Sequence, residues 1–214
     1  MEGLDRFQLF LTEEPDGFMS LAEAIGSRSQ ELIDDLKHTT GAPTSAVASS
    51  VFMRRFGLFI AGQLYLLAHG QIWDGPPGAV RLKQTAHGIA FSADSRFIRK
   101  RKEEDLALVL KQQAAPVVES VRKAGHVSKL ILWENIWGYV IWMYGMTDTE
   151  QAQADVQQLL DDDFWKPDMK KSHFRQFLNG KTLAESQQDY KRLTCCLYKE
   201  LPDTDKCPYC PLAK

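Results

Sequence analysis

Cysteine is absent from the first 194 residues of this 214-residue chain. All four cysteines, Cys195, Cys196, Cys207 and Cys210, lie among the last twenty residues. The beginning of the sequence also lacks the basic and apolar regions of a secretory signal, so we expect a cytoplasmic protein whose thiols stay reduced. In that compartment, clustered cysteines are metal ligands or redox groups more often than structural disulfides.

An excess of charge is missing too. The sequence has 26 Lys and Arg against 28 Asp and Glu, a formal net charge of -2. This balance gives no electrostatic basis for binding nucleic acid or an anionic membrane. The two most apolar stretches, 56–73 and 130–146, contain Gln63 and Glu134 respectively. Neither therefore supplies the about 18 consecutive apolar residues of a transmembrane helix, and we expect buried core helices without stable membrane insertion.

No repeat, low-complexity segment or clear linker divides the chain, so we predict a single domain over 1–214. Apolar residues at helical spacing predict a mainly α fold of the α+β type. The alternation over 79–93 predicts one small antiparallel β-hairpin or sheet, with His87 in its turn. Gly57 and Gly62 are possible breaks in the second helix, and Pro116 is expected to kink or break the third. The predicted helices span 20–38, 44–70, 101–125, 128–145, 147–163 and 169–180.

The cysteines follow the spacing C-C-x10-C-x2-C. A C-x2-C turn such as Cys207–Cys210 points both sulfurs at one metal. Adjacent side chains on an extended chain point to opposite sides, so Cys195 and Cys196 can share a site only if the backbone turns there. Three chemistries stay open at this point: a [2Fe-2S] cluster on four thiolates, a structural zinc site, or a thiol–disulfide couple of Cys207 and Cys210.

The segment "RLTCCLYKELPDTDKCPYCPL", residues 192–212, resembles the C-terminal signature of the FhuF-like ferric-siderophore reductases. The four cysteines of that signature fall on those of this chain without a gap, and Arg192, Pro211 and Leu212 also agree. Weaker similarity covers "LWENIWGYV" at 132–140 and "APTSAVASSVFMRRFG" at 42–57.

This resemblance implies an oxidoreductase with a C-terminal iron–sulfur segment at 192–212, in which Cys195, Cys196, Cys207 and Cys210 bind one [2Fe-2S] cluster. The cluster would pass one electron to an imported ferric siderophore or citrate-type ferric chelate and release Fe(II). An electron donor of the ferredoxin or flavoprotein type would be needed. No catalytic residue beyond the cluster is expected, because the sequence offers no nucleophile–base constellation. The alternatives are a non-enzymatic zinc protein with a four-cysteine structural or interaction tail, and an electron carrier whose acceptor is another protein.

The substrate site is harder to predict. The segment "RFIRKRK", residues 96–102, carries five basic residues, which could attract an anionic chelate or simply form a solvated helix start. Arg54 and Arg55 are adjacent on a helix, so at most one can face a single target. Glu134 and Asn135 need partners or solvent within an otherwise apolar aromatic helix, where a buried carboxylate would mark a site. The predicted substrate residues are Arg55, His87, Arg96, Arg99, Lys100 and Arg101.

Overall fold

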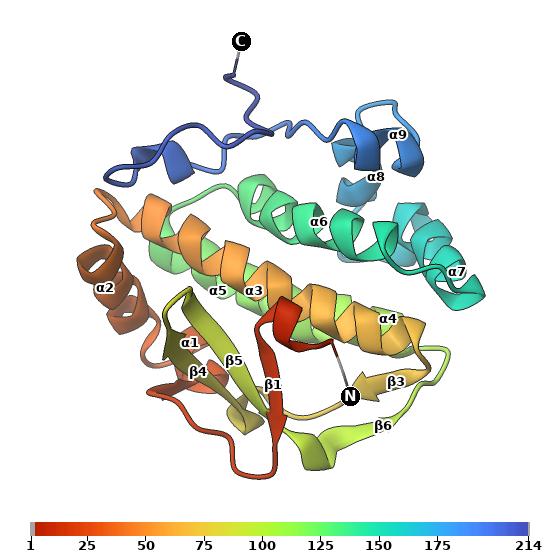
Figure 1. Cartoon of the computed structure of the whole chain (residues 1–214), viewed down its shortest axis with the longest axis horizontal. Helices are drawn as coiled ribbons and strands as arrows, with labels where there is room; N and C mark the ends of the chain where they lie inside the picture. Colours follow the sequence, from red (N-terminus) through yellow and green to blue (C-terminus); the bar gives the residue numbers. More distant parts are fainter. Residues whose placement is uncertain (1–2, 214) are drawn as a thin grey trace.

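A long helix, α3 (Ser45–Ala68), runs through the middle of the molecule in the computed structural model, which describes residues 3–213 (Figure 1). It begins after Thr44, whose hydroxyl accepts a hydrogen bond of 3.3 Å from the amide of Val47, the usual device for satisfying the first turn. Of its 24 residues, 18 are buried. The helix is long and apolar enough to cross a membrane, but 78% of its most apolar window is covered by the rest of the protein.

The fold is mainly α with α+β character, as predicted: helices account for 55% of the chain and strands for 12%. The helices around α3 are α1 (Leu21–Ile25), α2 (Ser29–Thr40), α4 (Asp105–Ala107), α5 (Ala115–Gly125), α6 (Lys129–Gly145), α7 (Glu150–Leu160), α8 (His173–Phe177) and α9 (Leu183–Gln188). A π-helical turn, η4 (Leu108–Ala114), joins α4 to α5. The 3-10 turns are η1 (Asp5–Phe7), η2 (Pro77–Ala79), η3 (Ser95–Phe97), η5 (Asp163–Trp165) and η6 (Tyr198–Glu200).

The sheet has four strands in the order β1-β5-β4-β2. Strands β4 (Val80–Thr85) and β5 (Gly88–Asp94) form the predicted antiparallel hairpin, with Thr85 opposite Gly88. The sequence did not reveal β1 (Leu9–Thr12), which pairs with β5 in parallel, or β2 (Met19–Ser20). A separate antiparallel pair consists of β3 (Gln71–Trp73) and β6 (Ile98–Lys100).

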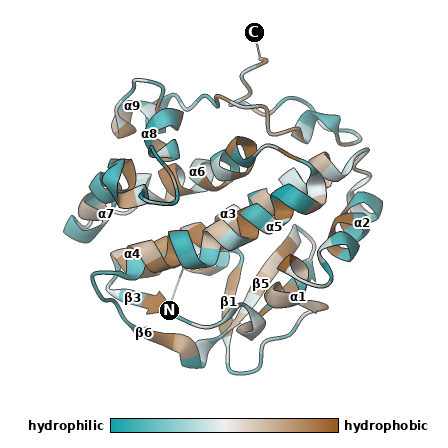
Figure 2. Ribbon diagram, turned by 180° about the vertical axis from the view of Figure 1, so that it is seen from behind, coloured by the Kyte–Doolittle hydropathy of each residue, from teal (hydrophilic) through white to brown (hydrophobic). Residues whose placement is uncertain are grey.

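The elements are stacked in layers. The sheet packs against one side of α3, where the Phe91 ring lies 5.0 Å from that of Phe59. Helix α6 covers another side of α3, and the cysteine-containing segment lies over α6 and the first turns of α3, away from the sheet (Figure 1). The outer helices α2 and α7 carry both hydrophilic and hydrophobic residues (Figure 2), whereas most of α3 is buried. A single cluster of buried apolar side chains joins the sheet, α3, α5 and α6.

Several predicted helix boundaries were wrong. The helix expected over 20–38 is two helices, because α1 ends at Gly26. Helix α3 is not broken at Gly57 or Gly62. Both glycines instead make room for neighbours, since a Cβ on Gly57 would lie 2.7 Å from the carbonyl oxygen of Asn135. The helix predicted from residue 101 begins at Asp105.

Candidate metal centre and adjoining cavity

Glu134 lies in the middle of α6 and is fully buried. Its carboxylate accepts hydrogen bonds from the amides of Leu193 (2.6 Å) and Thr194 (2.8 Å), and from the Thr194 hydroxyl. The Arg192 guanidinium forms an ion pair with the same carboxylate at 3.4 Å. The partners that the sequence required for Glu134 thus come from the residues directly before the first cysteine.

A second set of buried polar groups holds the cysteine segment to α3. The Ser50 hydroxyl donates a hydrogen bond of 2.6 Å to the backbone carbonyl of Cys196. The Asn135 side-chain amide donates in turn to the Ser50 hydroxyl (2.8 Å) and to the Ser50 carbonyl (3.1 Å). Helices α3 and α6 therefore fix the backbone of one cysteine together.

These contacts place the cysteines deeper in the protein than residues near a chain terminus usually lie. A chain terminus with no core behind it tends to lie on the surface, yet Cys196 and Cys210 are buried and Cys195 and Cys207 half-buried. None of the four forms a disulfide. The amide of Cys210 donates to the Cys207 carbonyl at 3.0 Å, which closes the C-x2-C turn.

Two sulfurs, those of Cys196 and Cys207, lie 4.0 Å apart. Two thiolates on one tetrahedral metal are about 3.8 Å apart, given metal–sulfur bonds of about 2.3 Å. The chain also turns directly after the adjacent pair, because Leu197 has a left-handed backbone with φ of 60°. The Leu197 amide donates to the Cys195 sulfur at 3.4 Å, and such bonds tune the potential of iron–sulfur clusters.

The donor set suits a thiolate-bound metal group. Soft thiolates favour zinc and iron–sulfur clusters over hard cations, and four reduced thiols lie in one anchored segment with one pair at sharing distance. Among residues 3–213, however, no three Cys, His, Asp or Glu side chains converge on one point. The residues present therefore fit the chemistry of a four-thiolate cluster or zinc site, and the donor types and the close sulfur pair carry this assignment.

The Cys207 thiol and the Arg54 guanidinium, both near the Cys196 sulfur, have pKa values shifted from their ordinary ones. Burial raises the pKa of the Cys207 thiol, and the neighbouring Cys196 raises it further. A coordinated cation reverses this effect, because a metal-bound thiol loses its proton. A half-buried cation is already present: Nη1 of Arg54 lies 3.8 Å from the Cys196 sulfur. Burial lowers the pKa of Arg54, but Tyr139 and Cys196 outweigh burial and raise it above its ordinary value.

Arg54, and not the predicted Arg55, lies at the cysteines. Its guanidinium carbon sits 4.5 Å from the centroid of the Tyr198 ring, which orients it. Arg55 points to the hairpin turn, where its Nε would lie 3.1 Å from a Cβ on Gly88. The predicted His87 precedes Gly88 in this turn and is exposed. The structure thus brings Arg55 close to the turn that holds His87 and separates both from the thiols.

The predicted basic segment has a different environment from the one expected. It forms η3 and β6 instead of a helix start, and three of its residues pair with carboxylates at 2.6–2.7 Å: Arg96 with Asp94, Arg99 with Asp74 and Asp105, and Arg101 with Asp155. Lys100 is exposed. A hollow of about 440 Å³ lies beside Lys100, Arg101 and Lys102, but β6 is at the opposite end of the molecule from the cysteine segment (Figure 1).

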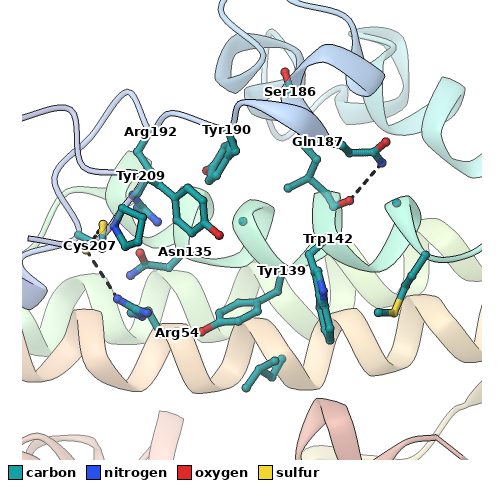
Figure 3. Close-up of a pocket in the computed structure, with 17 residues that line it drawn as sticks. Arg54, Asn135, Tyr139, Trp142, Ser186, Gln187, Tyr190, Arg192, Cys207 and Tyr209 are labelled. Carbon is teal, nitrogen blue, oxygen red and sulfur yellow. Dashed lines mark hydrogen bonds between the residues drawn. The ribbon is translucent and has the colours of Figure 1, made fainter. Parts of the chain in front are cut away.

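A larger cavity, of about 580 Å³, opens between α3, α6 and the C-terminal segment (Figure 3). Cys196 and Cys207 form part of its wall, and Arg54 lies near Cys207 at the same end of the cavity (Figure 3). The sequence did not predict this cavity, since its walls come from residues far apart in the chain. Its other walls include Asn135, Gly138, Tyr139, Trp142, Tyr190 and Tyr209.

No model of a known protein family matches the chain, and comparison with curated proteins also gives no match. The resemblance to FhuF-like reductases therefore depends on the cysteine spacing and the flanking residues of the C-terminal segment.

Proposed function

We propose that this protein is an iron–sulfur oxidoreductase that reduces ferric siderophores or related ferric chelates. Cys195, Cys196, Cys207 and Cys210 would hold the [2Fe-2S] cluster. Such a cluster, when bound, carries one electron from a donor protein of the ferredoxin or flavoprotein class to chelated Fe(III), which becomes Fe(II). Oxygen-donor chelators hold the softer Fe(II) less well, so reduction releases the iron.

One observation favours this function over a structural zinc site. Cys196 and Cys207, whose sulfurs lie 4.0 Å apart, form part of the wall of a cavity of about 580 Å³. Cavities of roughly 300–1,000 Å³ accept small-molecule ligands. A metal that served only as a folding staple would not require a small-molecule cavity beside its ligands.

The roles of the protein side chains follow from their contacts. Glu134 and Ser50 hold the backbone of the cysteine segment in place through hydrogen bonds. Arg54 places a positive charge beside Cys196, which stabilises negative charge on the sulfurs. Electron transfer of this kind breaks no covalent bond in the chelator, so the site needs no nucleophile or general base.

Metal analysis of anaerobically purified protein tests the proposal. We expect two irons and two acid-labile sulfides per chain, with visible absorption that dithionite bleaches. Stopped-flow mixing of the reduced protein with ferric chelates should then restore the absorption. Zinc without sulfide would contradict the cluster, whereas a cluster that no chelate oxidises would contradict the substrate and favour a protein acceptor.

A further inference from the structure

The cavity beside the cysteines has an apolar outer wall. Trp142 and Met146 lie on it, and each remains 41% exposed. Trp142 also packs against Phe7, with ring centroids 5.5 Å apart, so its indole is held in place at the cavity wall. Large exposed apolar side chains around a concave site are typical of ligand contact.

Gly138 keeps this cavity open. A glycine inside a helix is less favourable than an alanine, so a glycine in the middle of α6 calls for a reason. Packing does not supply one, because a Cβ on Gly138 would meet only Tyr190, at an ordinary contact distance of 3.7 Å. The missing side chain leaves space between α6 and Tyr190, which is part of the cavity.

The charges of the cavity are already matched. Within residues 3–213, its lining contains two arginines and no carboxylate. Arg192 is paired with the buried carboxylate of Glu134, and Arg54 lies against the Cys196 sulfur. A highly anionic ligand would find no cation without a partner, and a cationic ligand would find no carboxylate.

Three polar atoms of the lining have no hydrogen-bond partner within the described part of the chain: Oδ1 of Asn135, the hydroxyl of Tyr190 and Nη2 of Arg192. Asn135 is 1% exposed, and it lies beside Arg54 at the cysteine end of the cavity (Figure 3). Buried polar atoms of this kind are costly unless they are bonded. A ligand with oxygen acceptors would satisfy the Tyr190 hydroxyl and Nη2 of Arg192, whereas Oδ1 of Asn135 requires a donor.

We propose that this cavity binds the ferric chelate, and that it favours a compact chelate of near-zero net charge with an apolar outer surface. The proposal rests on the proposed function, since it takes the substrate to be a ferric chelate. It places the chelated iron against the wall formed by Cys196 and Cys207. It also assigns the basic hollow near Lys100 no part in chelate binding.

Calorimetric titration of the cluster-loaded protein with redox-inert gallium(III) complexes tests this site. Gallium tris(maltolate) is neutral and apolar outside, whereas gallium EDTA is an anion. We expect the neutral complex to bind at least tenfold more tightly than the anion. Gly138→Phe, which fills the cavity, should weaken binding of the neutral complex at least tenfold, Gly138→Ala should weaken it less, and Lys100→Ala should leave it unchanged.

The proposal would be overturned if folded Gly138→Phe bound the neutral complex as tightly as the unsubstituted protein does. It would also be overturned if the protein preferred the anionic complex and Lys100→Ala abolished that preference. Circular dichroism shows whether Gly138→Phe is folded. If it is not, Trp142→Ala takes its place, with an expected loss of at least fivefold, and unchanged binding by this variant would overturn the site.

Stopped-flow oxidation of the reduced protein distinguishes failure of this binding site from failure of the proposed reductase function. If ferric tris(maltolate) does not oxidise the cluster, but gallium binding is present and sensitive to Gly138→Phe, the function fails and the site stands. If Gly138→Phe reduces the ferric complex at the unsubstituted rate and binds gallium equally well, the site fails and the function stands.

Discussion

The carboxylate of Glu134 accepts a hydrogen bond of 2.8 Å from the backbone amide of Thr194, the residue directly before the first cysteine. The two residues are 60 positions apart in the sequence. This bond joins the middle of the core helix α6 to the start of the cysteine segment. It makes the position of the thiols dependent on a charge inside the core.

Replacement of Glu134 by Gln should detach this segment. The amide keeps the size of the side chain but removes the charge that balances the buried Arg192, and it offers one acceptor oxygen where two now serve. Breaking a buried ion pair by removing one partner costs about 3–5 kcal/mol. We expect a loss of about this size in urea unfolding and faster loss of cluster absorbance. The exposed Glu103→Gln should show neither effect, and equal stability of the two variants would contradict this role of Glu134.

Arg54 should raise the reduction potential of the bound cluster. Its guanidinium lies beside the Cys196 sulfur, so it stabilises the electron that reduction adds. Loss of an interaction of about 1.4 kcal/mol lowers a one-electron potential by about 59 mV. We expect a decrease of this order in Arg54→Leu, measured by redox titration. Arg55→Leu is the matched control, because Arg55 points to the hairpin turn. A similar shift in both variants would contradict the local role of Arg54.

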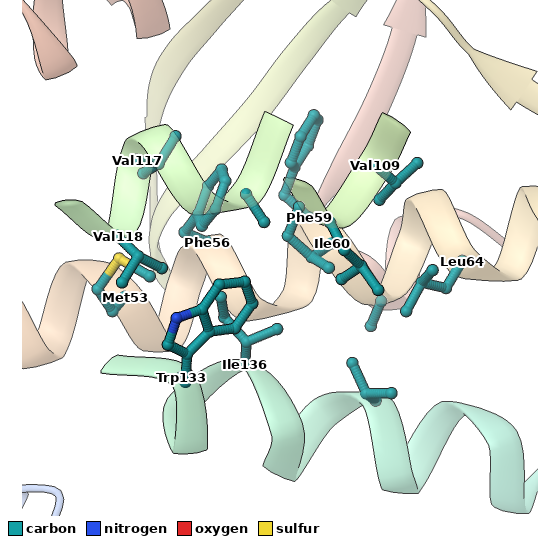
Figure 4. Close-up of a cluster of buried hydrophobic side chains, with 14 of the residues drawn as sticks. Met53, Phe56, Phe59, Ile60, Leu64, Val109, Val117, Val118, Trp133 and Ile136 are labelled. Carbon is teal, nitrogen blue, oxygen red and sulfur yellow. The ribbon is translucent and has the colours of Figure 1, made fainter. Parts of the chain in front are cut away.

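Two glycines on facing helices should respond oppositely to alanine. At Gly57 the backbones of α3 and α6 approach closely, and a Cβ would lie 2.7 Å from the carbonyl oxygen of Asn135. Figure 4 shows Trp133 and Ile136 of α6 packed at this contact with α3. Gly57→Ala should therefore destabilise the protein by about 1–3 kcal/mol.

Gly138→Ala should instead stabilise the protein by roughly 0.5–1 kcal/mol, because its Cβ meets no obstacle and the helix gains a better former. Urea unfolding of both variants measures the difference. An increase in stability for Gly57→Ala would show that the two helices lie further apart than described.

The ion pair between Arg99 and Asp105 should make the free energy of unfolding depend on pH in the acidic range. Burial raises the pKa of Asp105, but hydrogen bonds from Arg99 and from the Lys102 amide outweigh it, so the pKa falls below its ordinary value of 3.8. The unfolded chain then binds more protons than the folded one at low pH. The contribution of this pair is complete above the unfolded pKa and is lost as the pH falls through the folded one.

Asp105→Asn should accordingly be less stable than the unsubstituted protein at pH 7. We expect a loss of about 2–4 kcal/mol, which is smaller than for a fully buried ion pair because Arg99 is partly exposed. The difference should shrink between pH 4 and pH 2. Urea unfolding across this range measures it, with the exposed Asp35→Asn as control. A difference that does not change with pH would exclude the titration of Asp105 as its cause.

The sequence predicted those features that depend on strong local patterns. The long apolar runs correctly predicted α3 and α6, and alternation predicted the β4–β5 hairpin. Glu134 was recognisable as a group that needs partners, because it interrupts an apolar helix. Strand β1 escaped prediction, since its four residues are too few to show alternation and its pairing partner lies 82 positions away.

The site itself depended on contacts that no local pattern encodes. The choice between Arg54 and Arg55 is decided by the rotation of α3 relative to the C-terminal segment. Similarly, Arg101 is 54 positions from its partner Asp155, so the basic segment is neutralised in part by carboxylates that are distant in the sequence and in part by the nearby Asp94 and Asp105. The cavity lies between α3, α6 and the C-terminal segment, so it can be predicted only when the relative positions of all three are known.

The last prediction concerns the ligands. Serine binds soft metals poorly compared with a thiolate, so Cys207→Ser should reduce iron and acid-labile sulfide to background and abolish reduction of ferric chelates. The helical signal in circular dichroism should persist, because the segment that follows α9 contributes no α-helix. Asp205→Asn, an exposed change in the same segment, should keep the full iron content. A Cys207→Ser variant with undiminished iron and sulfide would remove Cys207 from the ligand set.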